Sequence, residues 1–385
     1  MVEIREISES EKAYWDSEIR RFDYAHPLNA FDWGKIRQID NWSPIYLVAE
    51  RSGRFCGALM ILSKKIPFTP FSIFYSPRSP VWDYDDDETI EKLIEAARKI
   101  AKNKKALFLR CDPAIPEGVI ASNGDKLTRL GFRHLEQRWT FWNTPRDVSR
   151  IDLTRAQTAE GFFNLLDRDT RRCIRKAAKE GVAIEPATTE SELEIFYGIF
   201  KEFTVNKGFM SRGYEYQRRL WETYVTHENG RLFLAKYQGN IIGGLICIMF
   251  ADKCLAMHMG TPYKYHNLYS YYAYVWESIK WAKERGCRWY SFRGVGTTPT
   301  QEHFKNKFLP EPVGMAGYYD LPFRSWLYRI FYVLEFQALP RAWPALIRVR
   351  RIYKTALTIF GQQSLTGQRP GLYTRLKQNL QRTAP

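Results

Sequence analysis

The chain has 385 residues, of which 45% are hydrophobic and 15% aromatic, and this composition excludes an intrinsically disordered protein. Its length exceeds what one ordinary hydrophobic core accommodates, so we expect two domains and an appendage. The net charge of +16 and the pI of about 9.5 favour an anionic partner such as RNA, a sugar nucleotide or an acidic membrane surface, without choosing among them.

The cysteines and the N-terminus point to a reducing compartment. Six cysteines lie apart in apolar segments, with no CxxC pair and no His/Cys cluster, so we expect buried thiols and no metal site. The first fifteen residues lack the apolar core of a signal peptide. No stretch reaches the roughly 18 apolar residues that a bilayer span requires. We therefore expect a cytoplasmic protein.

The first part of the chain reads as helices followed by strands. Residues 8–40 predict a helix, a turn and a second helix, with Lys35 directly after Trp33 and Gly34. Aromatic and β-branched runs with Gly and Pro between them predict the strands that follow. Acidic residues then open a helix that runs through Lys102, where they suit the helix dipole. A buried strand with the sequence ALFLRCDP comes next.

The second part of the chain repeats this order. LVAERSGRFCGAL (47–59) aligns with FLAKYQGNIIGGL (233–245), and Ala49, Gly53 and Gly57 match Ala235, Gly239 and Gly243. Both stretches predict a strand, a turn and a strand. In each copy a helix carrying Ala-Lys near its end then precedes an apolar strand. Two such copies indicate a duplicated α/β architecture with a cleft between the halves, and clefts of this kind favour ligand binding.

Between the copies lies a strongly basic helix, predicted over 167–182 and ended by Gly181. Its basic side chains are those of Arg168, Arg171, Arg172, Arg175, Lys176 and Lys179. They form either a solvated helix face or a phosphate-binding stripe. Farther along, Arg212, Tyr214 and Tyr216 lie on a loop entering a helix, where a diphosphate or a sugar could bind.

A loop after the last apolar strand gathers the residues of a candidate active site. The strand 288–292 ends near Gly294 and Gly296, which allow a tight turn and a close approach to a ligand. Phe304 to Phe308 then alternates aromatic and cationic side chains, which predicts a short strand or turn that presents an ammonium group. A solvated basic turn is the alternative reading of this stretch.

The C-terminal stretch 324–385 holds eleven Lys and Arg residues and one acid, Glu335. Its first part predicts an amphipathic aromatic helix stopped by Pro340. Such a helix either lies on an anionic membrane surface or on RNA, or packs its apolar face on the protein body.

The ordered set of these motifs resembles the Fem family of aminoacyl-tRNA-dependent transferases, which build peptidoglycan interpeptide bridges. The similar elements are RxxIRKAxKxGV at 171–182, YSPRSPVWDYDD at 75–86, FKNKF…GYYDLP at 304–322, WGK at 33–35 and the loop at 211–216. The resemblance implies an α/β fold of two tandem GNAT-like domains, with mixed sheets flanked by helices. The expected domains are 1–148 and 149–323, followed by a basic helical extension, 324–385.

The resemblance also implies a reaction and its residues. An amine of a stem or bridge peptide would attack the ester of an aminoacyl-tRNA, with a UDP-linked or lipid-linked muropeptide as acceptor. Lys305 would be the catalytic cation. Phe304 would position it and would belong to the substrate-binding residues, while Lys35, Arg212 and Tyr216 would contact the muropeptide nucleotide or phosphates. Aminoacyl-tRNA would be a co-substrate, with no bound cofactor and no metal.

Physical chemistry agrees with such a site. The ester is already activated, so no enzyme nucleophile is required. Attack creates a tetrahedral oxyanion, which a fixed ammonium group stabilises. The base that keeps the amine neutral is not identified. The chain also lacks the long helical hairpin that some family members carry for tRNA, so tRNA would use the basic surface. Which amino acid is transferred does not follow from the sequence.

Two other functions compete with this one. An acyl-CoA-dependent N-acyltransferase would need an RxxGxG/A-type pyrophosphate loop, and neither copy has that glycine pattern. A non-catalytic protein that binds RNA or a membrane surface would be indifferent to loss of Lys305. The histidines do not separate these readings, since His258 on a predicted strand suits a satisfied core position better than a cleft.

Overall fold

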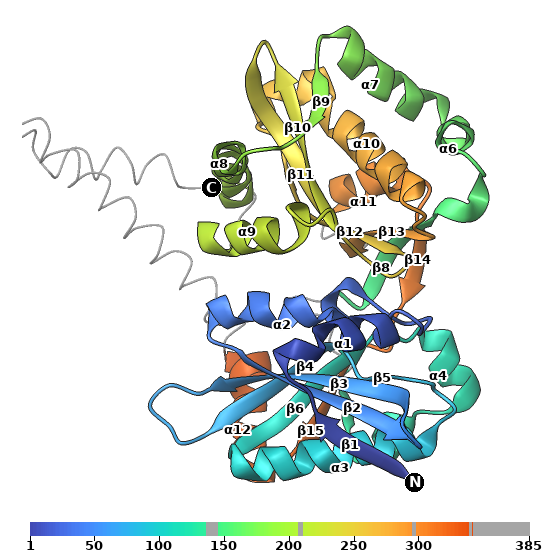
Figure 1. Cartoon of the computed structure of the whole chain (residues 1–385). Coiled ribbons are helices and arrows are strands. Elements are labelled where there is room, and N and C mark those ends of the chain that lie inside the picture. The colour runs from blue at the N-terminus through green and yellow to red at the C-terminus, as the bar shows by residue number, and fades with distance from the viewer. Residues whose placement is uncertain (136–144, 207–210, 295–297, 339–340, 342–385) are drawn as a thin grey trace, which may run out of the picture. The chain divides into compact units, whose positions relative to one another are not determined.

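The computed structural model describes residues 1–135, 145–206, 211–294, 298–338 and 341. It divides into two compact units, 1–328 and 329–385, which are considered separately. The first unit holds two mixed sheets flanked by helices (Figure 1). Of the second unit, the structure describes the end of one helix and the short turn that follows it. The duplicated α/β architecture expected from the repeat is therefore confirmed.

The first sheet has the strand order β1-β2-β3-β4-β6-β15-β7, and β5 pairs with β3. All its pairs are antiparallel except β4 with β6. Its strands are β1 (Val2–Glu6), β2 (Ser43–Arg51), β3 (Arg54–Lys65), β4 (Ser72–Arg78), β5 (Val81–Trp82), β6 (Ala106–Pro113), β7 (Arg133–Leu135) and β15 (Tyr318–Pro322). The predicted strands of the first part are thus present.

The second sheet has the order β14-β8-β13-β12-β11-β10-β9. Here β12 and β13 are the parallel pair, as β4 and β6 are in the first sheet. Its strands are β8 (Asp147–Asp152), β9 (Ala183–Pro186), β10 (Gly230–Tyr237), β11 (Asn240–Phe250), β12 (Lys253–Gly260), β13 (Trp289–Gly294) and β14 (Glu311–Gly314).

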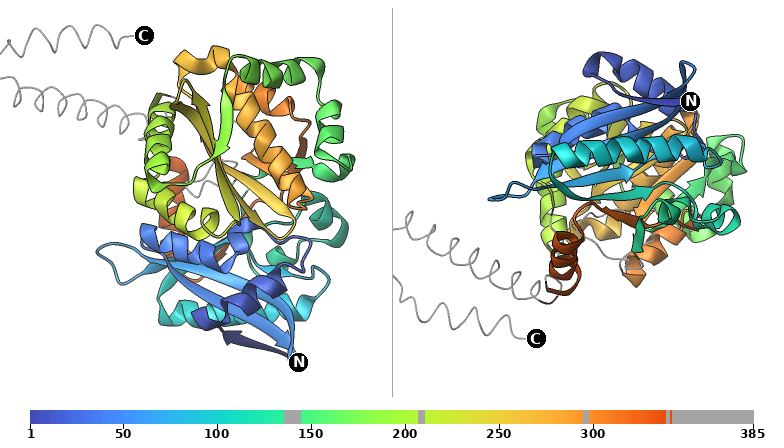
Figure 2. Two further views of the ribbon diagram at one scale, coloured as in Figure 1. Left: turned by 45° about the horizontal axis from the view of Figure 1, so that its top comes forward. Right: turned by 90° about the horizontal axis from the view of Figure 1, so that it is seen from below.

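Helices cover the sheets on both faces, as the views in Figures 1 and 2 show. On the first sheet α3 packs on one face, and α1 and α2 lie on the other. On the second sheet α10 and α8 occupy opposite faces. The α-helices are α1 (Lys12–Ile19), α2 (Phe31–Arg37), α3 (Asp87–Asn103), α4 (Glu117–Asn123), α5 (Lys126–Arg129), α6 (Ala159–Leu165), α7 (Arg168–Lys179), α8 (Glu190–Asn206), α9 (Tyr214–Leu220), α10 (Ser270–Glu284), α11 (Pro299–Asn306) and α12 (Ser325–Val333).

Short helical turns complete the connections. They are η1 (Glu9–Glu11), η2 (Pro27–Asn29), η3 (Gln38–Asp40), η4 (Leu153–Arg155), η5 (Trp221–Val225), η6 (Tyr263–Leu268) and η7 (Leu334–Ala338). The helix expected through Lys102 is α3, which the Asp86 carboxylate caps by accepting from the Thr89 amide at 3.1 Å.

The sequence repeat corresponds to two hairpins of the same geometry. The β2–β3 pair shifts register directly after Ala49, and the β10–β11 pair shifts directly after the matching Ala235. Both turns place their glycine in the left-handed region, with φ 73° at Gly53 and 75° at Gly239. Since a bulge and a positive φ recur at aligned positions, the duplication extends to backbone detail.

One strand links the end of the described fold to its beginning. β15 follows β14 of the second sheet in the chain, but it inserts between β6 and β7 of the first sheet. There Asp320 accepts two hydrogen bonds from Arg110, both at 2.7 Å, and neither side chain is exposed. The predicted boundaries at 148 and 323 stay a prediction, because sheet membership alone does not define a domain.

The cysteines and the C-terminal helix agree with the sequence. Cys111, Cys247, Cys254 and Cys287 are buried, Cys56 and Cys173 are half-buried, and all six are free. The predicted helix after Arg324 is present as α12, whereas Pro340 lies outside the described residues. What the tail contacts therefore stays a prediction. None of the helices in the described part combines the length and hydrophobicity that crossing a bilayer requires.

Candidate active site

Lys305 lies on α11, a helix where the sequence had predicted a strand or turn. That prediction was wrong because the stretch has a helix start and a helical period. The Thr298 hydroxyl accepts from the Gln301 amide at 3.3 Å, and Pro299 occupies the first turn. Phe304 and Phe308 are four residues apart, so their rings meet on one face with centroids 5.5 Å apart.

The Lys305 ammonium group is held against the end of β13. It donates to the carbonyl oxygens of Phe292, at 3.4 Å, and of Gly294. Burial lowers the pKa of Lys305 to about 8, and the charge of Arg293 acts in the same direction. The side chain is therefore fixed in place by two backbone carbonyls, and its pKa lies closer to neutral pH than that of an exposed lysine.

Phe304 anchors α11 to the core of the second sheet. Its ring makes edge contacts with Tyr271 and Tyr272 of α10, with both centroid distances at 5.3 Å. These contacts suit the expectation that Phe304 positions Lys305, because they fix the helix turn that carries the ammonium group. Direct contact between Phe304 and a substrate stays a prediction.

Arg212 and Tyr216 form one unit at the start of α9. The Arg212 guanidinium carbon lies 4.7 Å from the centre of the Tyr216 ring, and Tyr216 is buried. Arg212 also pairs with the carboxylate of Asp40, which ends η3 about 170 residues earlier in the chain. An ion pair thus connects α9 to the first part of the chain. Asp40 was not singled out in the sequence.

Arg293 is a second residue that the sequence did not reveal. It lies on β13 between the two carbonyls that hold Lys305, and its φ of 70° is left-handed. Desolvation lowers the pKa of Arg293, and the charges of Arg212 and Arg78 lower it further, while Tyr216 opposes them. Arg293 therefore connects Lys305 electrostatically with Arg212 and Tyr216.

Arg78 brings a further cation to this cluster from the first sheet. It is buried at the end of β4, where a terminal nitrogen donates to the Pro145 carbonyl at 2.9 Å. Its Nε lies 3.7 Å from Oδ2 of Asp112. We call Arg78, Arg212, Arg293 and Lys305 the cationic cluster. Its members come from β4, β13, α11 and the residues before α9, so only tertiary folding assembles them.

The two histidines near the cluster stay neutral. His258 on β12 has its Nδ1 3.0 Å from Oε1 of Gln217, and burial with Arg293 and Arg212 lowers its pKa to about 3. The satisfied position expected for His258 is thus confirmed. Burial, followed by the charge of Arg78, lowers the pKa of His26 well below its ordinary value. Cations raise the cost of protonating an adjacent imidazole.

The contacts of Lys35 in the described part of the chain are with residues outside the cluster. Lys35 is on α2, pairs with the carboxylate of Glu9 and lies 5.8 Å from the ring centre of Phe31. Within the described residues it has no hydrogen bond, ion pair or ring contact with Arg212, Tyr216 or Lys305. Of the five predicted site residues, Lys305, Arg212 and Tyr216 are connected electrostatically through Arg293, and Phe304 adjoins Lys305 on α11. The contacts of Lys35 do not connect it to these four.

A cavity of about 300 Å³ lies beside β12 and β13. Its lining includes the basic residues Arg150, Lys253 and Arg288 and the acidic residues Asp23 and Asp252, so its polar side carries both signs of charge. Arg150 stacks over the ring of Trp289 at 3.8 Å, which fixes that guanidinium group. Within the described ranges, no group of three or more His, Cys, Asp or Glu side chains could hold a metal ion.

The basic helix α7 is present as predicted. The Asp167 carboxylate caps it by accepting from the Thr170 amide at 2.7 Å, and Gly181 after its end has φ 85°. Thr170, Ile174 and Ala177 face the core, while most of its basic side chains are exposed. Whether this face binds phosphate stays a prediction.

Comparisons with known proteins identify the relatives of this chain. Residues 16–240 and 228–335 match the FemAB family. Lipid II:glycine glycyltransferases from Staphylococcus epidermidis and Staphylococcus aureus are each 27% identical, over 234 and 232 residues. Each match covers 56% of this chain, and it spans only about half of the relative, 53% and 52% respectively.

Solved structures share the fold. The crystal structure of FemX is 18% identical, with a TM-score of 0.76 over 85% of this chain and 99% of that one. A tandem GNAT protein from the clavulanic acid biosynthesis pathway is 12% identical, with a TM-score of 0.51 over 84% and 98%. At these identities the likeness shows the fold alone, and it confirms the tandem GNAT-like prediction.

Proposed function

The chain belongs to the FemAB family, and from that premise we propose that it moves an amino acid from aminoacyl-tRNA to an amine of a peptidoglycan precursor. The acceptor amine belongs to the stem or bridge peptide of a UDP-linked or lipid-linked muropeptide. The observation that carries the proposal is the cationic cluster, in which the fixed ammonium group of Lys305 and the buried guanidinium group of Arg78 both interact electrostatically with Arg293. The names of the Staphylococcus relatives support the substrate class.

The reaction needs charge stabilisation more than it needs an enzyme nucleophile. The acceptor nitrogen forms a bond to the ester carbonyl carbon, and the carbonyl oxygen becomes an oxyanion. The ester C–O bond then breaks, and the proton lost by the nitrogen ends on the released tRNA hydroxyl. Lys305 stabilises the oxyanion, since its ammonium group is held by two backbone carbonyls and need not reorganise. Arg293 strengthens the positive potential at the same place.

Arg212 and Tyr216 are proposed to bind the anionic part of the muropeptide. Arg212 pairs with Asp40, so an arriving phosphate would compete with that carboxylate for the guanidinium group. Lys35 is proposed to contact the same substrate at a separate point, because its contacts are with Glu9 and Phe31. The tRNA would lie on basic surface such as the exposed face of α7.

Removing Arg212 is expected to weaken muropeptide binding. Hydrogen bonds to charged groups contribute about 1.5–3 kcal/mol, so Arg212→Ala is expected to lower kcat/KM for the muropeptide by about 10- to 100-fold. Most of the loss is expected in KM. Steady-state kinetics with varied muropeptide measures this. Arg218→Ala is the matched control, because Arg218 lies on α9 six residues after Arg212 and pairs with Glu215 and Glu222. Equal effects of the two changes would contradict the role of Arg212.

The pH dependence is expected to report the proton on Lys305. The protonated side chain stabilises the oxyanion, and its pKa is about 8, so this contribution is complete below that pH and is lost above it. In Lys305→Arg the cation persists to higher pH. The ratio of the wild-type rate to the Lys305→Arg rate is therefore expected to fall as pH rises through about 8. A ratio independent of pH would argue against the ammonium role.

The test of the reaction class uses the full chain with a pool of labelled aminoacyl-tRNAs. UDP-linked muropeptide, lipid-linked muropeptide and acetyl-CoA are supplied in separate arms. Label that moves from tRNA to a muropeptide, and that ribonuclease abolishes, is the expected result. Acyl transfer from acetyl-CoA in place of transfer from tRNA would overturn the proposal in favour of an acyl-CoA-dependent enzyme. Binding of RNA or of membranes without any turnover would favour the non-catalytic reading.

A further inference from the structure

An exposed aromatic side chain stands at the tip of the β3–β4 hairpin. Residues 66–71 connect β3 to β4, and Phe68 at their centre has a relative exposure of 107%. Pro67, Thr69 and Pro70 beside it are exposed as well. Because the described part of the fold leaves this ring uncovered, transferring it into an apolar phase would be favourable.

The backbone conformation at this tip is unfavourable for a phenylalanine, so the folded state alone does not account for an aromatic residue at position 68. Phe68 has φ 61°, a left-handed conformation that Gly and Asn adopt readily and that an aromatic residue rarely adopts. The tip is nevertheless well ordered by its own hydrogen bonds. The Ile66 amide donates to the Phe71 carbonyl at 2.9 Å, and the Thr69 amide donates to the Ile66 carbonyl at 3.2 Å. The hairpin thus holds Phe68 outward in a fixed position.

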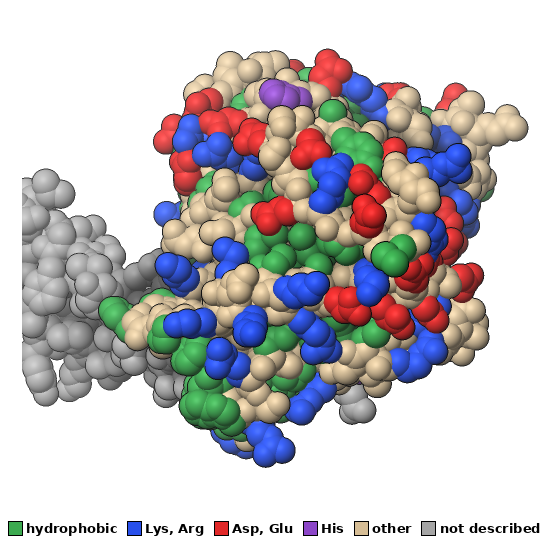
Figure 3. All heavy atoms as spheres, turned by 60° about the horizontal axis from the view of Figure 1, so that its bottom comes forward, with side chains coloured by type: hydrophobic (Ala, Val, Ile, Leu, Met, Phe, Trp, Pro, Cys, Tyr) green, Lys and Arg blue, Asp and Glu red, His purple; other side chains and the backbone are tan. Residues whose placement is uncertain are grey.

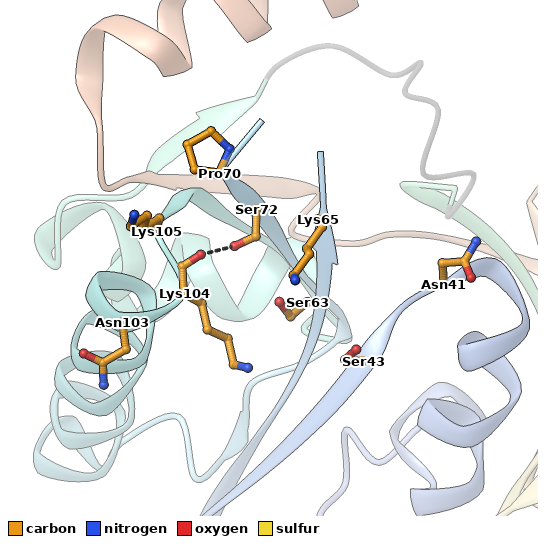
Figure 4. Close-up of a pocket in the computed structure, with 9 residues that line it drawn as sticks. All are labelled: Asn41, Ser43, Ser63, Lys65, Pro70, Ser72, Asn103, Lys104 and Lys105. Atoms are coloured by element: carbon orange, nitrogen blue, oxygen red, sulfur yellow. Dashed lines mark hydrogen bonds between the residues drawn. The ribbon is translucent and has the colours of Figure 1, made fainter. Parts of the chain in front are cut away.

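Beside this tip is a pocket of about 560 Å³ (Figure 4). Its lining combines lysines with hydroxyl and amide groups and no acid: Asn41, Ser43, Ser63, Lys65, Pro70, Ser72, Asn103, Lys104 and Lys105. Figure 4 shows the side chains of Lys65 and Lys104 reaching toward the space between the end of α3 and strands β2 and β3. Ammonium, hydroxyl and amide donors together suit a phosphate group.

The surroundings keep the same sign of charge. The sequence has no Asp or Glu between Glu50 and Asp83, and none between Glu95 and Asp112, and these two stretches contain the hairpin and the end of α3. Figure 3 shows Lys and Arg side chains over the lower left of this face, while Asp and Glu gather toward its right and upper parts. At the base of the hairpin Arg324 lies 5.4 Å from the ring centre of Phe71.

From this arrangement we propose that the β3–β4 hairpin and the lysine pocket dock the protein on an anionic phospholipid surface. Phe68 enters the boundary between headgroups and acyl chains, and the pocket with Lys65 and Lys104 takes a lipid phosphate. A single ring and a few lysines give reversible binding, since each lysine near an anionic membrane contributes about fivefold in affinity. The proposal concerns binding alone and does not depend on the transfer reaction.

The test measures binding of the full chain to vesicles by co-sedimentation. Vesicles of phosphatidylcholine with phosphatidylglycerol are compared with vesicles of phosphatidylcholine alone, and binding is expected only to the former. Phe68→Asn removes the ring and suits the left-handed backbone, so it is expected to weaken binding and to leave the fold intact. The double variant Lys65→Gln with Lys104→Gln is expected to lose about 20-fold or more in affinity.

Matched controls separate this face from general charge and hydrophobicity. Tyr263→Asn removes an aromatic side chain that is 87% exposed elsewhere in the fold, and Lys179→Gln removes an exposed lysine from α7. Both are expected to bind vesicles as the wild type does. If the hairpin and pocket variants bound the anionic vesicles as tightly as the wild type does, membrane binding would lie elsewhere in the chain and the proposal would be overturned. The proposal would also be overturned if the hairpin and pocket variants lost tRNA binding and kept vesicle binding, because the hairpin and the pocket would then bind RNA.

Discussion

Replacing Lys305 with Met is expected to lower the rate of aminoacyl transfer by about 10²–10³ while the protein remains folded. Methionine keeps the length and the apolar part of the side chain, so α11 can still pack through Phe304 on α10. The change removes the one ammonium group that the Phe292 and Gly294 carbonyls fix. A single-turnover assay with preformed aminoacyl-tRNA measures the chemical step directly.

Lys307→Met is the matched control for this prediction. Lys307 follows Lys305 by two residues, but its ammonium group lies 3.6 Å from the carboxylate of Asp167 at the start of α7. We expect a change of less than about tenfold, because exposed ion pairs contribute less than about 1 kcal/mol. If the Lys305→Met variant transferred the amino acid as fast as the Lys307→Met variant does, oxyanion stabilisation by Lys305 would be refuted. A loss in both variants would indicate that the charge of the whole α11 segment is what matters.

The second large effect is expected on stability, from Asp320→Asn in β15. Asp320 and Arg110 have no exposed side-chain surface, and the Tyr328 hydroxyl donates to the same carboxylate at 2.9 Å. Removing the negative charge leaves the Arg110 guanidinium group buried without its counter-charge, which typically costs about 3–5 kcal/mol. Urea unfolding followed by tryptophan fluorescence measures the loss in the free energy of unfolding.

Two further variants define what the second prediction means. Glu228→Gln breaks the exposed pair with Arg285, for which we expect a loss of less than about 1 kcal/mol. Replacing both members, as Arg110→Met with Asp320→Leu, is expected to cost less than Asp320→Asn alone, because no uncompensated charge remains buried. If Asp320→Asn were no more costly than Glu228→Gln, β15 would not depend on this pair for its place between β6 and β7.

The two effects concern opposite ends of one segment. α11 carries Lys305 to the end of β13 in the second sheet, and β15 follows twelve residues after Asn306 and pairs in the first sheet. The chain thus returns to the first sheet after the candidate catalytic helix, with only the short strand β14 between them. Because Asp320 is assigned a role in stability and none in the transfer reaction, Asp320→Asn is expected to reduce activity only in proportion to the unfolded fraction.

The sequence by itself determined the fold class, because the duplication is visible in short stretches of matching residues. Ala49 and Ala235 precede matching bulges, and Gly53 and Gly239 provide the same left-handed turn. Hydrophobic alternation and glycine position act over a few residues, so they can be read without tertiary contacts. The same holds for the basic helix α7, which has a capping Asp167 and a terminal Gly181.

Lys305 was found through its motif, but its surroundings were not. The strand or turn predicted around it is a helix, although the four-residue spacing of Phe304 and Phe308 carried a helical signal. The alternation of aromatic and cationic residues over 304–308 is typical of a strand, and it masked the helical signal of that spacing. The lowered pKa of Lys305 depends on burial and on Arg293, and burial is set by packing between distant elements.

Only the tertiary structure decided which residues share the site. Arg78, Arg212, Arg293 and Lys305 are spread over more than two hundred residues, and only the folded chain brings their charges close enough to act on the pKa of Arg293 and of Lys305. Likewise Asp40 reaches Arg212, and β15 crosses to the first sheet where Asp320 meets Arg110. Long-range pairing depends on how complementary surfaces meet in the folded chain, and no local pattern in a single sequence records it.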